Sequence, residues 1–395
     1  LAIPGLGFAA AYFEAVSGLT ATGATVLTGL DRLPPSINLW RAELHWIGGL
    51  GVIVLAVAVL PLLGVGGRQL MRAEVPSPIK EAGLTPRVTE TAKGFWKIYL
   101  ALTALCALAY GLFGMSWLDA LTHAFSTVAL GGFSSHDASL GFFDSPALEA
   151  TTIFFAALSG LSYVTHLAAL TGRSLRPYLR DGELPFFLGV LGASVLLVAG
   201  YLWQQNYYSE FAVALRHAAF NTVSVATTLG YATVDYAQWP FFAPLWMLFL
   251  CSFMTCSGST GGGLKMMRAI ILYKQVFREV LHSVHPAATT YIKLGGATVP
   301  NRIILAVLGF GFLYMVCTIA FTLALAATGL DILTAFSAAV ATFNNTGPGL
   351  GQVGPAGNYG GFDGLQLGIG SFAMLLGRLE IFTLLVVLTP AFWRK

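Results

Sequence analysis

The chain has 395 residues, of which 56% are hydrophobic and only 10% are charged. Soluble domains carry about 25% charged residues, so this composition indicates a membrane protein. The 45 glycines agree with it, since small residues let spanning helices approach closely. A net charge of +3 is too small to indicate a nucleic-acid partner. The 4 cysteines lie in or beside apolar runs without metal-ligand spacing, which predicts small core residues.

Apolar runs of about 20 residues, long enough to cross a bilayer, recur along the chain. The continuous ones cover residues 44–64, 98–116, 151–171, 185–203, 303–328 and 366–393. One further run, over residues 241–281, is interrupted by the sequence CSGSTGGG at residues 256–263. Each glycine costs a helix about 1 kcal/mol relative to alanine, so we expect the helix to break here.

Four similar short stretches lie between the apolar runs. They are FEAVSGLTATGATV at 13–26, STVALGGFS at 126–134, NTVSVATTLGY at 221–231 and AAVATFNNTGPG at 338–349. Their aligned glycines are Gly23, Gly132, Gly230 and Gly347, which recur at intervals of roughly 100 residues. The helical part of each stretch, about a dozen residues, is too short to span a bilayer. It must therefore enter and return on one side, and the loop after it must line a cavity.

The pattern predicts an all-α membrane protein of four pseudo-symmetric units around a central pore. Each unit reads as outer span, pore helix, filter loop and inner span. The units are residues 1–64, 94–171, 184–285, which contains the interrupted inner helix, and 302–395. Residues 65–93, 172–183 and 286–301 are the predicted cytoplasmic connections. The chain begins with Leu1 directly before the first short stretch, so we expect the first unit to be truncated at its amino end and to lack its outer helix.

Charge distribution predicts the orientation. Of the 21 Lys and Arg residues, 17 lie in residues 65–97, 173–180 and 265–302 or at the end of the chain, and Lys and Arg are enriched in cytoplasmic loops. The opposite face has many acids, among them Asp31, Asp137 and Asp235. We expect the filter loops to open on this acidic side, where negative charge concentrates cations. Each acid taken singly is explained about as well by a solvated outer loop.

The four glycine loops predict binding of a monovalent cation. A dehydrated ion needs several oxygen ligands, and a ring of backbone carbonyls supplies them without a fixed charge. Glycine lets successive carbonyls point at one axis, since it accepts backbone angles that other residues resist. The short helices should direct their carboxyl ends, which carry partial negative charge, at the same place. The alternative is four tight turns that merely join helices.

At this point the sequence resembles a known family, the TrkH and KtrB potassium transporters of the Trk/Ktr/HKT superfamily, and it is closer to the TrkH branch. The motifs that carry the resemblance are VSGLTATGATV (16–26), LHWIGGLG (44–51), STVALGGFSSHDAS (126–139), TTLGYATVDYAQWP (227–240), CSGSTGGGLKMMR (256–268), NNTGPGLG (344–351) and LLGRLEIFT (375–383). The resemblance covers nearly all of the chain. It implies four pore-loop units around one potassium pathway, in a homodimer.

The resemblance also implies a filter made of backbone carbonyls. They are those of Ala21, Thr22, Gly23, Leu130, Gly131, Gly132, Thr228, Leu229, Gly230, Asn345, Thr346 and Gly347. The family more often has Thr at the positions of Ala21 and Leu130. Because carbonyls rather than side chains bind the ion, we expect conduction to survive both differences. Sodium-preferring plant members carry Ser at the position of Gly23, so the glycine here favours potassium.

Two features beneath the filter resemble the family's gate. They are Arg378 and the loop of Ser257, Gly258, Ser259, Thr260, Gly261, Gly262 and Gly263. Arg378 lies in the middle of the last apolar run, where a charge is costly and by default functional. We expect it to hydrogen-bond the carbonyls of residues 256–263 or to raise an electrostatic barrier below the filter. The alternatives are a simple packing loop and an ion pair between inner helices; Glu380, two residues along the helix, is a weak partner.

The sequence therefore predicts potassium uptake across the cytoplasmic membrane of a prokaryote. Potassium is the transported ion, and we expect no enzymatic activity, organic cofactor or nucleic-acid partner. The resemblance implies cytoplasmic nucleotide-binding regulatory subunits of the TrkA or KtrA type, and the basic face from Lys265 to Arg302 is where we expect docking. The alternative is a secondary solute transporter with alternating access and cation coupling. Such a transporter has interrupted helices at matching places in two halves, whereas one interruption is predicted here.

Overall fold

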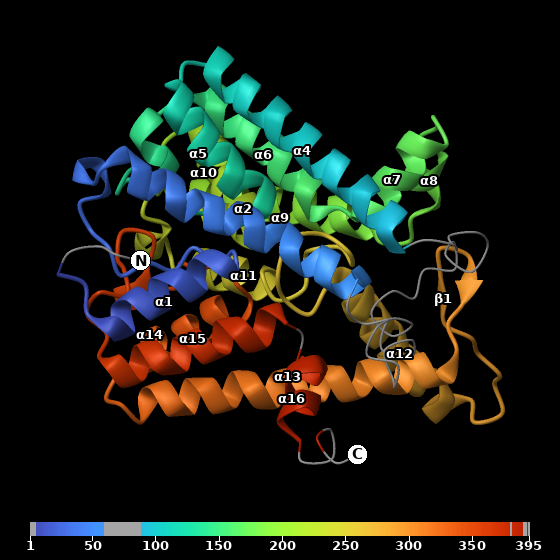
Figure 1. The fold of residues 1–395 in the computed structure, drawn as a ribbon. Helices are drawn as coiled ribbons and strands as arrows, with labels where there is room; N and C mark the ends of the chain where they lie inside the picture. The colour runs from blue at the N-terminus through green and yellow to red at the C-terminus, as the bar shows by residue number, and fades with distance from the viewer. Residues whose placement is uncertain (1–4, 59–87, 380, 390–392, 394–395) are drawn as a thin grey trace.

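The computed structural model describes residues 5–58, 88–379, 381–389 and 393, and its regular structure consists of helices and one short hairpin (Figure 1). The longer elements are α1 Phe8–Leu19, α2 Pro35–Ala58, α4 Val88–Leu112, α5 Trp117–Ala129, α6 Pro146–Gly160, α7 Tyr163–Thr171, α9 Leu184–Gln204, α10 Phe211–Ala226, α11 Phe242–Leu250, α12 Met266–Val284, α13 Asn301–Ala326, α14 Ile332–Phe343, α15 Gly364–Arg378 and α16 Ile381–Leu388. The five-residue helix α8, Arg176–Arg180, and the antiparallel strands β1, Lys293–Leu294, and β2, Ala297–Thr298, lie in connections.

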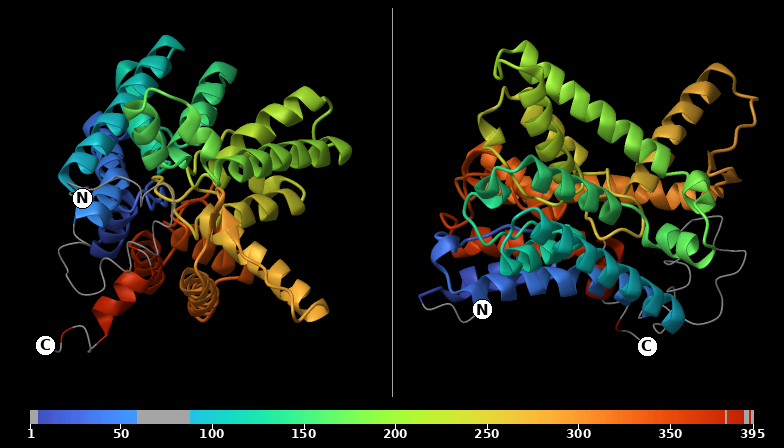
Figure 2. Two further views of the ribbon diagram at one scale, coloured as in Figure 1. Left: turned by 90° about the vertical axis from the view of Figure 1, so that its right-hand side faces the viewer. Right: turned by 90° about the horizontal axis from the view of Figure 1, so that it is seen from above.

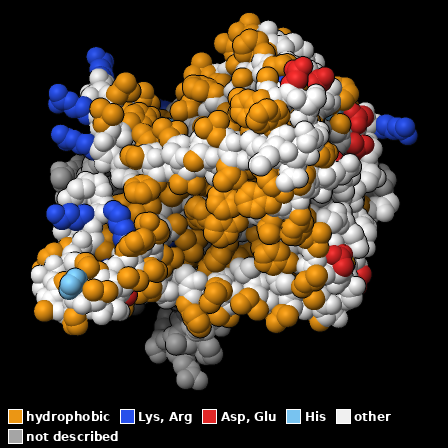
Figure 3. Space-filling model, turned by 180° about the vertical axis from the view of Figure 1, so that it is seen from behind, with side chains coloured by type: hydrophobic (Ala, Val, Ile, Leu, Met, Phe, Trp, Pro, Cys, Tyr) orange, Lys and Arg blue, Asp and Glu red, His pale blue; other side chains and the backbone are white. Residues whose placement is uncertain are grey.

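Long apolar helices make this a multi-pass membrane protein. Three described helices are long and apolar enough to cross a membrane alone: Thr91–Leu112 within α4, all of α9 and all of α13. They correspond to predicted spans, although α4 begins at Val88 rather than at residue 98. A broad apolar surface separates one end, where most Lys and Arg side chains gather, from an end that carries Asp and Glu (Figure 3). Residues 59–64 of the first predicted span and 65–87 of the first connection lie outside the described part.

The span predicted at residues 151–171 is broken, which corrects the expectation of a single interrupted helix. Helices α6 and α7 bend by 88° at residues 161–162. Backbone groups freed by a bend in a membrane need new partners, and the loop after α11 supplies them. The N–H of Cys256 donates to the carbonyl of Gly160 at 2.9 Å, and the N–H of Tyr163 donates to that of Gly258 at 3.0 Å. The predicted run 366–393 is divided too, since α15 ends at Arg378 and α16 begins at Ile381.

Each of the four repeated stretches forms the predicted short helix. Helices α1, α5, α10 and α14 have 12, 13, 16 and 12 residues. At 1.5 Å per residue they are about 18–24 Å long, less than the ~30 Å hydrocarbon core of a bilayer. Seen along the direction that most helices follow, the helices surround a centre filled by loops (Figure 2, left). The short helices therefore bring their loops to the middle of the molecule.

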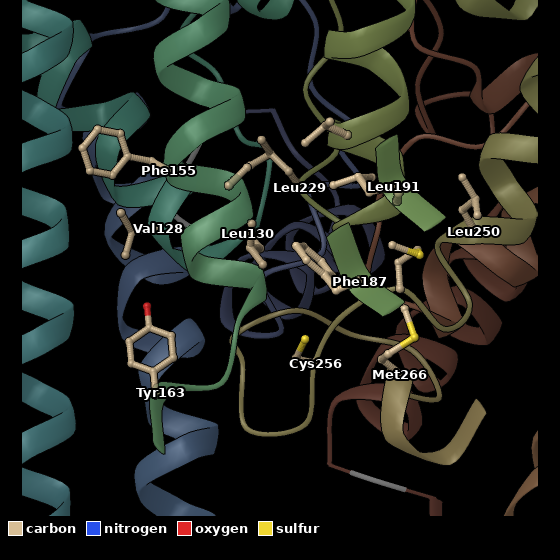
Figure 4. Packing of buried hydrophobic residues seen from close by; sticks show 14 of the residues in the cluster. Val128, Leu130, Phe155, Tyr163, Phe187, Leu191, Leu229, Leu250, Cys256 and Met266 are labelled. Carbon is tan, nitrogen blue, oxygen red and sulfur yellow. The ribbon is translucent and has the colours of Figure 1, made fainter. Parts of the chain in front are cut away.

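Apolar side chains of the loops anchor them in the core. Leu130 and Leu229 are 0% and 1% exposed, and both belong to the cluster that includes Phe155, Phe187 and Cys256. Figure 4 shows the two leucines close together above the loop that carries Cys256. Burying a leucine side chain contributes about 1.5–3 kcal/mol. The side chains at these positions thus serve packing, which leaves the main chain of the loops to face the centre.

Candidate functional site: four glycine turns around one opening

The four short helices end in the same backbone turn. A residue just after each helix adopts left-handed geometry, and a glycine with positive φ follows two residues later. The values of φ are 50° and 84° at Ala21 and Gly23, 56° and 81° at Leu130 and Gly132, 61° and 84° at Thr228 and Gly230, and 55° and 90° at Asn345 and Gly347. Left-handed geometry costs a non-glycine residue about 1–2 kcal/mol, so the surrounding packing must hold all four turns in place.

The same hydrogen bond closes each turn. The N–H of the residue between the left-handed residue and the glycine donates to a carbonyl five residues back in the helix. These bonds are Thr22 to Ser17 at 2.9 Å, Gly131 to Ser126 at 2.9 Å, Leu229 to Ser224 at 2.8 Å and Thr346 to Ala341 at 2.8 Å. They satisfy carbonyls that a helix end otherwise leaves without partners. The residues aligned by sequence are therefore equivalent in conformation.

The turns contact one another in a closed ring. A side chain added to each glycine would overlap a carbonyl oxygen of the next loop: that of Gly131 for Gly23, of Leu229 for Gly132, of Thr346 for Gly230, and of Thr22 for Gly347. All four glycines line one opening of about 80 Å³. Only glycine fits at these four places, because a Cβ atom is excluded by the neighbouring main chain. Main-chain oxygens therefore lie between neighbouring turns of the ring, and oxygens of this kind are the ligands that a dehydrated monovalent cation requires.

Side chains from other parts of the chain fix the loops to one another. The hydroxyl of Tyr231 donates to the carbonyl of Phe133 at 3.1 Å, and that of Tyr359 donates to the carbonyl of Gly347 at 2.9 Å. The amide of Asn345 donates to the hydroxyl of Thr22 at 2.9 Å and to the carbonyl of Met374 at 3.0 Å. The sequence assigned Asn345 a role through its carbonyl alone. Its side chain also joins the first and fourth loops.

Sequence reasoning also missed a buried ion pair behind the first two loops. Glu14 of α1 accepts a hydrogen bond from Nε of Arg41 of α2 at 2.9 Å, and the two side chains are 0% and 1% exposed. The sequence singled out neither residue. The available signal was an acidic residue within an otherwise apolar short helix, since buried charges are almost always paired.

The acids of the outer face divide into two groups. Asp137 lines the opening, and Asp31 accepts hydrogen bonds from Nδ1 of His136 at 2.5 Å and from the N–H of Asp137 at 3.2 Å. Although partial burial opposes it, the His136 and Asp137 hydrogen bonds lower the pKa of Asp31, which stays ionised. A second group has structural partners: Asp331 and Asp363 cap α14 and α15, and Asp144 and Glu149 pair with Arg216. For this second group, helix capping and ion pairing explain the acidic residues without a role in concentrating cations.

The break between α11 and α12 is longer than predicted, from Cys251 to Lys265, and it lies against the glycine loops. The hydroxyl of Thr260 donates to the carbonyl of Val128 at 3.1 Å, and the N–H of Gly262 donates to the hydroxyl of Thr228 at 3.0 Å. A Cβ atom on Gly262 would overlap the carbonyl of Asn344. The loop is thus held against residues at the ends of three of the short helices.

Arg378 points into this loop. Its Nη1 donates to the carbonyl of Thr260 at 2.7 Å, and its Nη2 to those of Gly48 and Gly49 on α2 at 3.1 and 3.4 Å. None of the described carboxylates forms an ion pair with it, and Glu380 lies outside the described residues. The bond to Thr260 is of the kind expected from the sequence, a hydrogen bond from Arg378 to a carbonyl of residues 256–263. Arg378 thereby joins the end of α15, the loop and α2.

Two further charged residues hold the loop: Glu183 lies in the connection before α9, and Lys265 lies at the end of the loop, directly before α12. Glu183 accepts a hydrogen bond from the N–H of Ser257 at 2.8 Å, and Nζ of Lys265 donates to the carbonyl of Gly261. Burial raises the pKa of Glu183 to about 7, against the smaller opposing effects of the Ser257 hydrogen bond and of Lys265. The sequence gave no reason to single out Glu183, because its partner lies 74 positions away.

Comparison with known proteins agrees with this architecture. A family model described as TrkH, cation transport protein, matches residues 2–395. The Trk system potassium uptake protein TrkH of Escherichia coli K12 is 49% identical over 394 residues, which cover 99% of this chain and 81% of that protein. The Trk system potassium uptake protein TrkG of the same strain is 39% identical over 390 residues, covering 99% and 80%. The crystal structure of the potassium transporter TrkH from Vibrio parahaemolyticus matches with a TM-score of 0.89 and 44% identity, over 99% of this chain and 80% of that one.

The spanning helices and the family match together define the class: this is a multi-pass membrane transport protein. Its relatives are named as potassium transport proteins rather than as enzymes. The chain belongs to the TrkH family of cation transport proteins.

Proposed function

We propose that this chain takes up potassium ions across the cytoplasmic membrane of a prokaryote, through a selectivity filter made by the four glycine turns. The observation that carries the proposal is the closed ring in which each aligned glycine abuts a carbonyl of the next loop around one opening. The choice of potassium is supported by relatives named as potassium uptake proteins. The ion is the cargo of a transporter, not the substrate of an enzyme, and its passage requires no organic cofactor.

We infer that four pseudo-symmetric units surround the pore. Repetition of the left-handed residue, the following glycine and the helix-closing hydrogen bond in each loop supports this organisation. Carbonyls of residues 21–23, 130–132, 228–230 and 345–347 would replace the water that an ion loses on entry. Asp137 at the opening, with Asp31 hydrogen-bonded to its N–H, would raise the local cation concentration.

The loop of residues 257–263 and Arg378 form the proposed gate. Residues of this loop contact the ends of pore helices, so an ion leaving the filter meets it next. Opening then requires the loop to move, which breaks the bonds from Arg378 to Thr260 and from Gly262 to Thr228. These contacts support a closed state in which hydrogen bonds, rather than large side chains, hold the loop in place.

We further propose a homodimer in the lipid bilayer that is controlled by cytoplasmic nucleotide-binding subunits of the TrkA or KtrA type. The words "Trk system" in the names of the relatives indicate a system of several components. The basic segment from Lys265 to Arg302, with α12 and the β1–β2 hairpin, is the proposed docking face.

A secondary solute transporter with alternating access remains the competing function. The break between α6 and α7 supplies the second interrupted span that such a transporter needs. However, the two breaks satisfy each other's backbone at Gly160 with Cys256 and at Tyr163 with Gly258, which leaves these groups engaged rather than facing a solute. The potassium pathway is therefore the favoured function.

Reconstitution with potassium, sodium and rubidium gradients tests the proposal through reversal potentials. The parent should prefer potassium to sodium. Gly23→Ser should lose that preference, because Gly23 has a φ of 84° and its added side chain would overlap the Gly131 carbonyl. Gly361→Ala is the matched control, since Gly361 has open space around it. Equal permeability to potassium and sodium in the parent would remove the selectivity claim.

A further inference from the structure

The buried pair of Glu14 and Arg41 has more contacts than an ion pair needs. Taking two charges out of water is costly unless the remaining lone pairs and protons also find partners. Those partners identify what the pair holds. They belong to the first two filter loops.

Glu14 holds the first loop just beyond its glycine. The hydroxyl of Thr25 donates to both carboxylate oxygens of Glu14, at 2.9 and 3.0 Å, and the N–H of Val26 donates to one of them at 3.0 Å. The N–H of Leu27 donates in turn to the hydroxyl of Thr25 at 3.1 Å. One carboxylate therefore fixes three consecutive residues, and the first of them lies two positions after Gly23.

Arg41 carries the connection to the second loop. Its Nη2 donates to the hydroxyl of Thr25 at 3.1 Å, and its Nη1 donates to the carbonyl of Ser134 at 3.3 Å. The guanidinium also lies over the ring of Phe133, 4.1 Å from its centroid, which is cation–π geometry. Ser134 lies two residues after Gly132, as Thr25 does after Gly23. The fork of donors thus joins equivalent positions of two neighbouring loops.

Two other links between the loops are hydrogen bonds between neutral groups. Tyr231 reaches Phe133 through its hydroxyl, and the N–H of Tyr359 donates to the carbonyl of Thr25 at 2.8 Å. Charged hydrogen bonds are roughly twice as strong as neutral ones, and a guanidinium presents its donors in a rigid plane. Arg41 also lines the opening, where Glu14 neutralises its charge.

We propose that Glu14 and Arg41 are positioning residues for ion selection: they set the separation of the first and second filter loops and keep the opening free of a net positive charge. Discrimination by carbonyl oxygens depends on the size of the site and on the field of the dipoles that form it. Both change if the two loops move apart. The inference rests on the proposed potassium filter.

The test compares reversal potentials and potassium conductance of the parent with those of Glu14→Gln, Arg41→Gln and Arg41→Lys. Both neutralising variants should lower the potassium-to-sodium permeability ratio by about tenfold, the change expected for a loss of about one charged hydrogen bond. Their potassium conductances should differ from each other. Glu14→Gln leaves a positive charge at the opening and should reduce conductance, whereas Arg41→Gln should not. Arg41→Lys keeps the charge without the fork, so conductance should survive while the ratio falls.

Arg216→Gln is the matched control, since Arg216 pairs with Glu149 at 2.6 Å and with Asp144 at 2.8 Å and does not line the opening. It should keep the parent's ratio. The double variant Glu14→Gln with Arg41→Gln leaves no lone buried charge and guards against misfolding of the single variants. A folded double variant with the parent's ratio would overturn the inference, and so would failure of all the pair's variants to fold, which would make the pair a fold determinant only. A parent without potassium selectivity would instead remove the proposed function.

Discussion

Arg378→Lys should weaken the proposed gate while keeping its charge. The arginine donates to Thr260 at 2.7 Å on the loop and to Gly48 and Gly49 at 3.1 and 3.4 Å on α2. A lysine ammonium is a point charge on a flexible stem and lacks the planar fork that reaches two segments at once. The substitution should therefore lose the bond to one of the two segments.

The size of the effect follows from that loss. A hydrogen bond that involves a charged group contributes about 1.5–3 kcal/mol. If the bond exists only while the loop blocks the pathway, its loss shifts the gating equilibrium toward the open state by about 10- to 150-fold. Arg378→Gln should open at least as far and should also raise the rate of cation passage, because it removes the positive charge beneath the filter.

Single-channel recording in planar bilayers gives the open probability, and rubidium uptake into proteoliposomes gives the flux. Thermal denaturation in detergent separates changes in gating from loss of the fold. Arg302→Lys is the control, since Arg302 is an exposed arginine in the first turn of α13. A folded Arg378→Lys protein with the open probability and flux of the parent would refute the assignment of Arg378 to the gate.

Two further predictions concern the contacts of the loop. Thr228→Val removes the acceptor of the Gly262 N–H at 3.0 Å and should raise the open probability about fivefold, as a net loss of ~1 kcal/mol implies. Thr227→Val is the control and should leave the open probability unchanged, because the Thr227 hydroxyl bonds carbonyls of its own helix. Equal open probabilities in single-channel records of the two variants would contradict this reasoning. Burial holds the pKa of Glu183 near 7 against a reference value of 4.5, so between these values the folded state binds a proton that the unfolded chain has released. Thermal stability should consequently fall as the pH rises through this window and level off above it, and Glu183→Gln should flatten the profile; an unchanged slope in that variant would show that other groups cause it.

The repeated turns could be predicted because their signal is local. Each short helix ends where the sequence turns from small apolar residues to Thr, Asn or Leu followed by glycine, and a glycine is needed wherever φ is strongly positive. The interruption after α11 was predictable for the same reason, since several glycines in a row destabilise any helix. Its length was underestimated because Cys251 to Thr255 contain no glycine or proline, and they leave the helix only through contacts with the rest of the fold.

The bend between α6 and α7 had no comparable signal. Residues 151–171 read as one apolar helix, and the bend is stable because the backbone of Cys256 and Gly258 supplies the hydrogen bonds that the broken helix loses. The roles of the acidic residues on the outer face could not be predicted from the sequence either. Composition indicated a negative face, but whether an acid caps a helix, as Asp331 does, or lines the opening, as Asp137 does, depends on what lies beside it.

The sequence by itself determined the membrane environment, the fourfold recurrence of glycine turns and the place of the break after α11, because apolar length and backbone conformational preference act within a few residues. Tertiary structure alone decided which loops are neighbours and which side chains hold them together. Asn345 meets Thr22 across 323 positions, Arg378 meets Thr260 across 118, and Arg41 meets Ser134 across 93. The physical reason is that a buried polar group must find a partner wherever packing brings one within about 3 Å, and packing is a property of the whole fold.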